Sequence, residues 1–82
     1  MFLIEFTKHA QNFFDKLPDK DAKIIAKKID SMRENPFRTL KRLQGDKLWR
    51  LRIGDYRIIV DVIVSNNKII VVRIGYRKNI YN

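Results

Sequence analysis

The segment that most restricts the fold is residues 48–64, which read LWRLRIGDYRIIVDVIV. Aromatic and β-branched residues are frequent on both sides of Gly54-Asp55, and residues 48–53 alternate with the period of a half-buried strand. A Gly-Asp pair between two such runs is typical of a two-residue turn. The segment therefore predicts an antiparallel β-hairpin that carries three arginines close to its turn.

Two helices are predicted in the first half of the chain. Apolar residues recur at helical spacing between Thr7, a helix-capping residue type, and Pro18. The same spacing continues from Asp19 to Asn35, where Pro36 is expected to end the second helix. The tight break at Pro18 makes the pair an antiparallel helical hairpin.

Strand-like segments on either side of the helices complete the fold. Residues 2–6 alternate as a short strand, residues 37–47 form a connection, and residues 68–74 follow the hairpin as a further strand after a second turn at Asn66-Asn67. The expected order is β-α-α-β-β-β. We expect a single α+β domain over residues 1–82, with the helices packed on one face of an antiparallel meander.

Composition limits the functions that such a domain can carry. The 82 residues contain 18 Lys and Arg against 9 Asp and Glu, a formal charge of +9, and no cysteine. The missing thiols exclude a disulfide scaffold and a thiolate metal site. The charge favours nucleic acid or an acidic protein as partner, although a membrane surface or simple solubility explains the same number. The amino-terminal apolar run is too short for a signal peptide, and we expect a cytoplasmic protein.

The hairpin register determines where its arginines point. With Gly54-Asp55 as a two-residue turn, Arg52 lies opposite Arg57, and Arg50 shares their face of the sheet. Like charges opposed in this way destabilise a sheet by about 0.2–1 kcal/mol per pair, whereas guanidinium groups match phosphate oxygens. Binding of a polyanion therefore explains the three arginines better than a structural role does. The alternative is that they are simply solvated on the hairpin surface.

The arginine face is also apolar away from the turn. The same register, extended through Asn66-Asn67, adds further residues around Asp61: Ile59, Ile63, Ile70, Val72 and Ile74. An exposed apolar patch of this kind invites association. We therefore expect a partner protein to cover it.

The carboxyl-terminal segment GYRKNIYN combines aromatic and basic residues. Tyr76, Arg77, Lys78 and Tyr81 suit the stacking and ion pairing of single-stranded RNA, and a frayed basic tail is the alternative. The single histidine, His9, is expected to be solvated, and no metal-ligand or cofactor motif occurs, so we expect neither metal nor cofactor. Arginines stabilise the charge of a phosphoryl transition state, and cleavage of RNA draws its nucleophile, the 2′-hydroxyl, from the substrate.

The chain resembles the RelE/ParE superfamily of toxins from toxin-antitoxin pairs, and within it the compact RelE-type toxins. The likeness rests on FFDKLPDKDAKIIAKKID over the helices, LWRLRIGDYRIIV at the hairpin and IGYRKNIY at the end. It implies a ribosome-dependent mRNA endoribonuclease that cuts in the A site. The implied partners are an acidic RelB-like antitoxin, the ribosome with its mRNA, and rRNA.

The resemblance also implies roles for individual residues. Arg57 and Arg77 would stabilise the phosphate and its transition state, Arg50 and Arg52 would position the RNA, and Tyr81 would stack or transfer a proton. Tyr76 and Lys78 would contact RNA. Arginines stand at Arg50 and Arg52 where relatives have lysines, so the general base stays open. A ParE-type gyrase inhibitor without nuclease activity, or an inert antitoxin-bound protein, would have the same fold.

Overall fold

A computed structural model describes residues 1–42 and 47–77 of the chain. Its described strands form a five-stranded sheet in the order β1-β5-β4-β3-β2. The helices and strands, including two short 3₁₀ helices, are β1 (Leu3–Phe6), α1 (Lys8–Asp15), α2 (Asp19–Ser31), η1 (Pro36–Arg38), β2 (Lys41–Arg42), β3 (Trp49–Ile53), β4 (Tyr56–Ile63), η2 (Val64–Asn66) and β5 (Lys68–Tyr76). The predicted α+β order is confirmed, with β2 as an addition.

The hairpin register agrees with the prediction. Ile53 pairs with Tyr56, Arg52 with Arg57, and Arg50 with Ile59 in an antiparallel β3–β4 ladder. Strand β5 pairs antiparallel with β4, while β1 pairs parallel with β5. The meander is therefore flanked by β1 at one edge and by β2 at the other.

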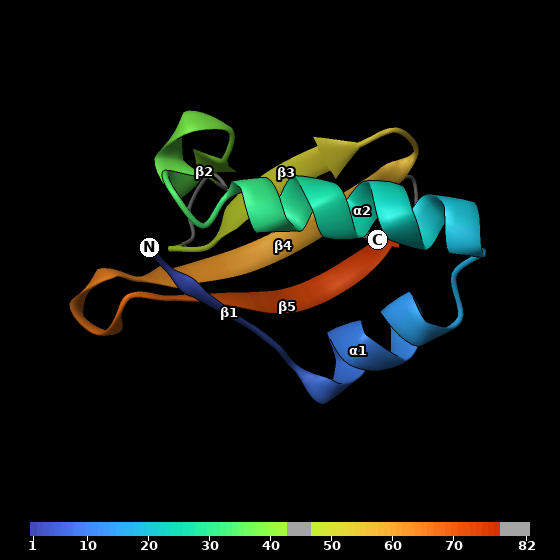
Figure 1. The fold of residues 1–82 in the computed structure, drawn as a ribbon, viewed down its shortest axis with the longest axis horizontal. Coiled ribbons are helices and arrows are strands. Elements are labelled where there is room, and N and C mark those ends of the chain that lie inside the picture. Colours follow the sequence, from blue (N-terminus) through green and yellow to red (C-terminus); the bar gives the residue numbers. More distant parts are fainter. Residues whose placement is uncertain (43–46, 78–82) are drawn as a thin grey trace.

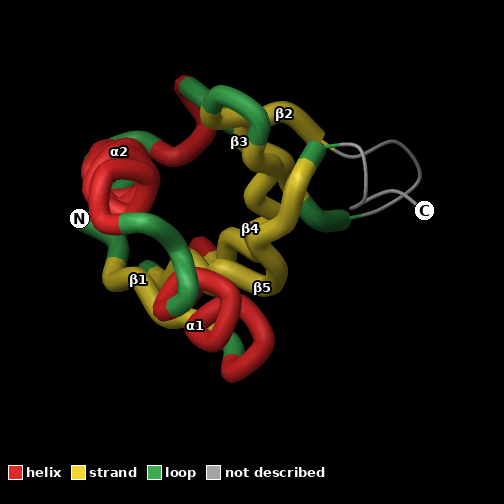
Figure 2. The backbone as a smooth tube through the Cα atoms, turned by 90° about the vertical axis from the view of Figure 1, so that its right-hand side faces the viewer, coloured by secondary structure: helices red, strands yellow, loops and turns green. Residues whose placement is uncertain are grey.

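Both helices bury their apolar sides on the same face of the sheet. Helix α2 runs in front of β3 and β4, and α1 lies beside β5 and β1 (Figure 1). Seen from the side, α2 lies on the concave side of the curved sheet, and α1 lies at the edge formed by β1 and β5 (Figure 2). The core cluster draws on both helices, the strands and the connection: Ala10, Ile25, Ile29, Met32, Leu40, Leu51, Ile58, Val60, Ile69, Val71 and Ile74.

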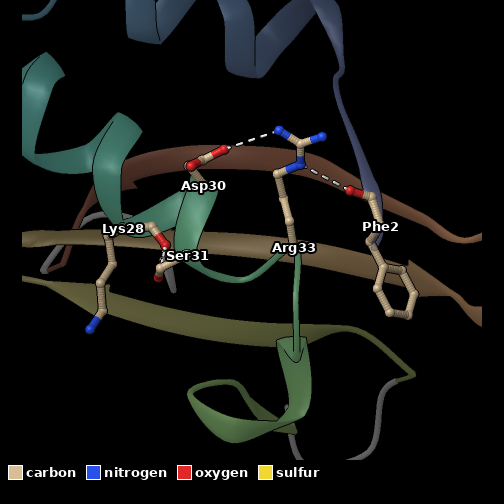
Figure 3. Close-up of polar contacts among 5 residues, drawn as sticks. All are labelled: Phe2, Lys28, Asp30, Ser31 and Arg33. Carbon is tan, nitrogen blue, oxygen red and sulfur yellow. Dashed lines mark hydrogen bonds and ion pairs between the residues drawn. The ribbon is translucent and has the colours of Figure 1, made fainter.

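Helix α2 ends at Ser31, earlier than the predicted Asn35. Two effects account for the difference. The residue before a proline avoids helical backbone angles, and Asn35 is extended with φ −152°. Arg33 is also tied to the first strand, because its carbonyl accepts from the Phe2 N–H (2.8 Å) and its Nε donates to the Phe2 carbonyl (3.2 Å) (Figure 3). The turn after α2 therefore serves tertiary contacts.

A β-bulge interrupts the β4–β5 ladder and changes which side chains share a face. Ile59 pairs with Arg73, but Val60 pairs with Val71, so Val72 has no partner across the ladder. The predicted register contained no bulge and placed Ile74 on the arginine face. That assignment is wrong: Ile74 pairs with Ile58 in the core and is 1% exposed. An extra residue in one strand reverses the facing of every residue beyond it.

The hairpin turn yields a first testable prediction. Gly54 has φ +56°, and an added Cβ there meets no heavy atom within 4 Å. Strain in the left-handed region, without any steric clash, should therefore make Gly54→Ala destabilise the fold by about 1–2 kcal/mol in urea unfolding. Gly54→Asn is the matched control and should cost less, because asparagine tolerates this region. Equal costs for both variants would contradict the explanation from φ.

Candidate functional site

Basic side chains gather on the sheet face that points away from the core. Arg52 lies opposite Arg57, and on the other side of Arg57 the ladder continues to Gly75, which adds no side chain. A second row crosses four strands at the next position of the same face: Lys41, Arg50, Ile59 and Arg73. We call this surface the basic face and define it by its cations, Lys41, Arg50, Arg52, Arg57 and Arg73.

Arg77 continues the basic face beyond the end of β5. Its backbone N–H donates to the carbonyl of Asp55 in the hairpin turn (2.8 Å). This bond extends the β4–β5 pairing by one step, and strand alternation then gives Arg77 the facing of Gly75 and Arg57. The hairpin turn and the end of β5 thus hold Arg77 beside the Arg52–Arg57 pair. The predicted arginine set Arg50, Arg52, Arg57 and Arg77 is brought together.

Arg57 differs from the other arginines in its burial. It is 8% exposed, whereas Arg52, Arg73 and Arg77 are exposed and Arg50 is intermediate. It lies on β4 and is flanked by Arg52 of β3 on one side and Gly75 of β5 on the other. A cation largely withdrawn from water interacts more strongly with an approaching anion, because the effective dielectric constant is lower. Arg57 is therefore the best-placed side chain on the basic face for stabilising a phosphate.

The opposite side of the hairpin end carries an aromatic cluster. The Tyr56 and Tyr76 rings stack with centroids 5.3 Å apart, and Phe13 of α1 meets the Tyr76 ring edge-on at 5.7 Å. The Tyr56 hydroxyl donates to the Asp21 carboxylate of α2 at 2.6 Å. A groove of about 940 Å³ adjoins this cluster, and Ile24 and Arg77 are among its lining residues. Tyr76 lies on the helix side of the sheet, and Arg57 also lines the groove, so the groove reaches both the aromatic cluster and the arginines.

The Tyr56–Asp21 bond gives a second testable prediction. The hydrogen bond to Asp21, together with burial, raises the pKa of Tyr56 well above its ordinary value. Unfolded tyrosine ionises near pH 10, so the stability from this bond should be complete below about pH 10 and decline as pH rises towards the folded pKa. Tyr56→Phe should cost about 1 kcal/mol at neutral pH, and this cost should shrink in alkali.

The variant Asp21→Asn is the control for that pH dependence. Its amide oxygen still accepts the hydrogen bond, but it lacks the carboxylate charge that favours the protonated phenol. The decline of stability in alkali should therefore be weaker than in the wild type when urea unfolding is followed between neutral pH and pH 11, roughly the range in which a free tyrosine ionises. A cost of Tyr56→Phe that does not change with pH would contradict the assignment.

Two predicted site residues lie outside the described part of the chain. Lys78 and Tyr81 fall beyond residue 77, and the structure therefore places neither of them. Their roles stay predictions. His9 is exposed, as expected for a solvated residue.

Two cations of the basic face were missed by the sequence reasoning. Lys41 lies on β2, a strand of two residues that was taken as part of a connection. Arg73 was not considered, because the predicted register had no bulge and put Ile74 on the arginine face in its place. One signal was available for Arg73: an arginine at a core-facing position of a strand is a conflict that a register shift resolves.

Two kinds of feature, a cluster of metal-ligand side chains and a long apolar helix, do not occur among the described residues. Within residues 1–42 and 47–77, no three acidic or histidine side chains gather as ligands. None of the helices described is long and apolar enough to cross a bilayer. The chemistry available on the basic face is that of guanidinium and ammonium groups.

Comparison with known proteins identifies the family. A family model described as the ParE toxin of type II toxin-antitoxin systems, parDE, matches residues 4–81. The chain belongs to this toxin family. A curated protein of Methanocaldococcus jannaschii named "Putative toxin RelE1" is 29% identical to the ParE-family chain over 98% of its length and 94% of the relative's.

Solved structures support the same superfamily through the fold. The RelB-RelE antitoxin-toxin complex from Methanococcus jannaschii contains a chain that is 26% identical, with a TM-score of 0.74 and 95% of both chains covered. Isolated Escherichia coli RelE gives a TM-score of 0.82 at 20% identity, covering 99% of the present chain and 92% of that one. This ParE-family toxin therefore has the RelE-like α+β fold, and it belongs to the RelE/ParE superfamily.

Proposed function

We propose that this toxin is an endoribonuclease that arrests translation by cutting mRNA in the ribosomal A site. The observation that carries the proposal is the pairing of Arg52 with Arg57 on one exposed sheet face, with Arg50 on the same face. Like charges directly opposed on a sheet disfavour a purely structural role for the pair, and a phosphate bound between the two guanidinium groups would turn this repulsion into attraction. The ribosome and its mRNA supply such phosphates in the cytoplasm.

The proposed reaction needs no group beyond the RNA and the protein side chains. The 2′-hydroxyl attacks the adjacent phosphorus and forms the 2′,3′-cyclic phosphate, while the bond to the 5′-oxygen breaks and leaves a 5′-hydroxyl. The proton lost from the 2′-hydroxyl is balanced by one gained at the leaving oxygen. Arg57 and Arg77 stabilise the negative charge that develops at phosphorus, because guanidinium groups stay protonated and fit two oxygens at once.

The remaining residues position the RNA in this proposal. Arg50 and Arg52 neutralise the neighbouring phosphates, and Tyr81 stacks on a base or moves a proton. Tyr76 and Lys78 contact the RNA next to the cut. The ribosome holds the mRNA in place. The arginines orient the phosphate that is cut and neutralise its charge, and both effects contribute strongly to phosphoryl transfer.

An acidic RelB-like antitoxin is proposed as the protein partner. The similar RelE chain from Methanococcus jannaschii was solved as an antitoxin-toxin complex. The net charge of +9 favours an acidic partner in the present case. Ile63 and Ile70 add partly exposed apolar surface beside the arginines, as expected where a partner chain covers the face.

Mapping mRNA ends in a translating extract tests the proposed activity. Purified toxin should create new 5′ ends inside translated codons, and primer extension should locate them at the ribosomal A site. The same mRNA without ribosomes should remain intact. Intact mRNA on translating ribosomes would contradict the proposal.

A ParE-type gyrase inhibitor is the second candidate function, because the matching family model is that of ParE toxins. Such a protein would bind gyrase and have no nuclease activity. A supercoiling assay separates the two candidates: inhibition or double-strand breaks with gyrase, combined with intact mRNA, would favour the second. An inert antitoxin-binding protein would be silent in both assays.

A further inference from the structure

The bulge in β5 is held by a hydroxyl group from the start of α1. Thr7 Oγ1 donates to the carbonyl of Val72 at 2.7 Å, and the Thr7 N–H donates to the carbonyl of Val71 at 3.0 Å. The same hydroxyl accepts from the Ala10 N–H at 3.1 Å and so caps α1. Since Val72 is the residue without a ladder partner, the Thr7 hydroxyl satisfies a carbonyl that the bulge displaces.

The bulge has a consequence for charge. With a regular ladder, Arg73 would face the core and Ile74 would face outward. The bulge reverses both: Ile74 is buried, and Arg73 is exposed opposite Ile59 on the basic face. One threonine hydroxyl at the start of a helix therefore stabilises the backbone geometry that adds Arg73 to the basic face.

Arg73 completes a line of cations that runs across the strands. Lys41, Arg50 and Arg73 occupy one cross-strand row on β2, β3 and β5. Three strand spacings make this row about 14 Å long, roughly the axial length of four stacked nucleotides. The row lies two residues along the strands from the Arg52–Arg57 pair, at the next position on the same face. It therefore runs beside the proposed cleavage site.

We infer that Lys41, Arg50 and Arg73 form a track for the backbone of single-stranded RNA, and that Thr7 is its positioning residue. The inference rests on the proposed function, which it deepens by stating where the RNA runs beyond the cut phosphate. The row contains three cations and the buried Ile59, and no aromatic side chain. Its contacts are therefore to phosphates, independent of base sequence, and sensitive to salt.

Binding of a short labelled RNA with methylated 2′-hydroxyls tests the track, because this RNA cannot be cut. Arg73→Gln should lower the affinity roughly fivefold and reduce the slope of log affinity against log salt by about 0.7, the share of one phosphate contact. Lys28→Gln removes the same charge from the exposed side of α2 and should leave the slope unchanged. Equal slopes for the two variants would overturn the track.

Variants at position 7 test the positioning role. Thr7→Val keeps the shape but loses the donor to Val72, and it should reproduce the slope change of Arg73→Gln, with no further change in the double variant. Thr7→Ser keeps the hydroxyl and should keep the wild-type slope. Thermal unfolding of each variant confirms that binding is measured on folded protein. A wild-type slope in folded Thr7→Val would overturn the role of Thr7.

The outcomes distinguish this inference from the proposed activity. Cleavage of mRNA on ribosomes together with a salt slope that does not depend on Arg73 would overturn the track and leave the activity standing. A slope that depends on Arg73 without cleavage would support the track and contradict the activity. Dependence on Arg73 for duplex DNA but not for the labelled RNA would overturn the track as an RNA site.

Discussion

Replacing Arg57 by alanine is expected to reduce mRNA cleavage on ribosomes by about 10²- to 10³-fold, the usual cost of removing one preorganised donor to a developing oxyanion. The magnitude follows from its position. Arg57 is 8% exposed and lies between Arg52 and Gly75, so its charge interacts with an anion in a less polar medium than that of the outer arginines. Primer extension on a translating extract measures the loss.

Two variants define what the Arg57 guanidinium contributes. Arg57→Lys keeps the charge but loses the planar pair of donors, and it should retain activity between the wild type and Arg57→Ala. Lys27→Ala removes a charge from the exposed side of α2 and should cleave as the wild type does. Urea unfolding of each variant ensures that cleavage is compared between folded proteins. Full cleavage by folded Arg57→Ala would contradict the proposed mechanism.

The hairpin could be predicted from sequence because its signals are local. Gly54 adopts a positive φ in a two-residue turn, and this turn fixes the Arg52–Arg57 pairing without reference to the rest of the fold. The facing of Arg50, Arg52 and Arg57 followed from the same short segment. The structure confirms the predicted pairing and facing of these three arginines, while their functional roles stay predictions.

The other half of the basic face depends on contacts that are distant in sequence. Arg73 faces outward because of the bulge at Val72, and the Val72 carbonyl is bonded by Thr7, 65 positions away. No periodicity within 68–76 indicates such a bond. Lys41 belongs to a two-residue strand that exists through pairing with Arg50 and Trp49, and strand propensity cannot detect so short an element.

The end of α2 was mispredicted for a related reason. The proline at position 36 marks a point that the helix cannot pass, but it does not set the last helical residue. The last helical residue depends on Arg33. Its carbonyl and its guanidinium group both form hydrogen bonds with the backbone of Phe2, directly before β1. In both errors, hydrogen bonds to a residue distant in sequence, Thr7 in one case and Phe2 in the other, prevailed over the local pattern.

Replacing Ile58 by alanine is expected to destabilise the fold by about 2–5 kcal/mol. Ile58 is 0% exposed and pairs with Leu51 and Ile74 in the middle of the core face. Its loss leaves a cavity in a closely packed core, and domains of this kind are stable by only about 5–15 kcal/mol in total. Urea unfolding of the free toxin with an unchanged m-value measures the effect.

Ile24→Ala is the matched control, since it removes the same atoms from a side chain on α2 that is 51% exposed. It should change the free energy of unfolding by less than about 0.5 kcal/mol. A cost as large as that of Ile58→Ala would mean that the Ile24 side chain, which lines the groove, is buried in an assembly. Arg57 and Ile58 are neighbours on opposite faces of β4, so Ile58→Ala should lose stability and retain cleavage below its unfolding temperature, while Arg57→Ala should lose cleavage even where it is fully folded.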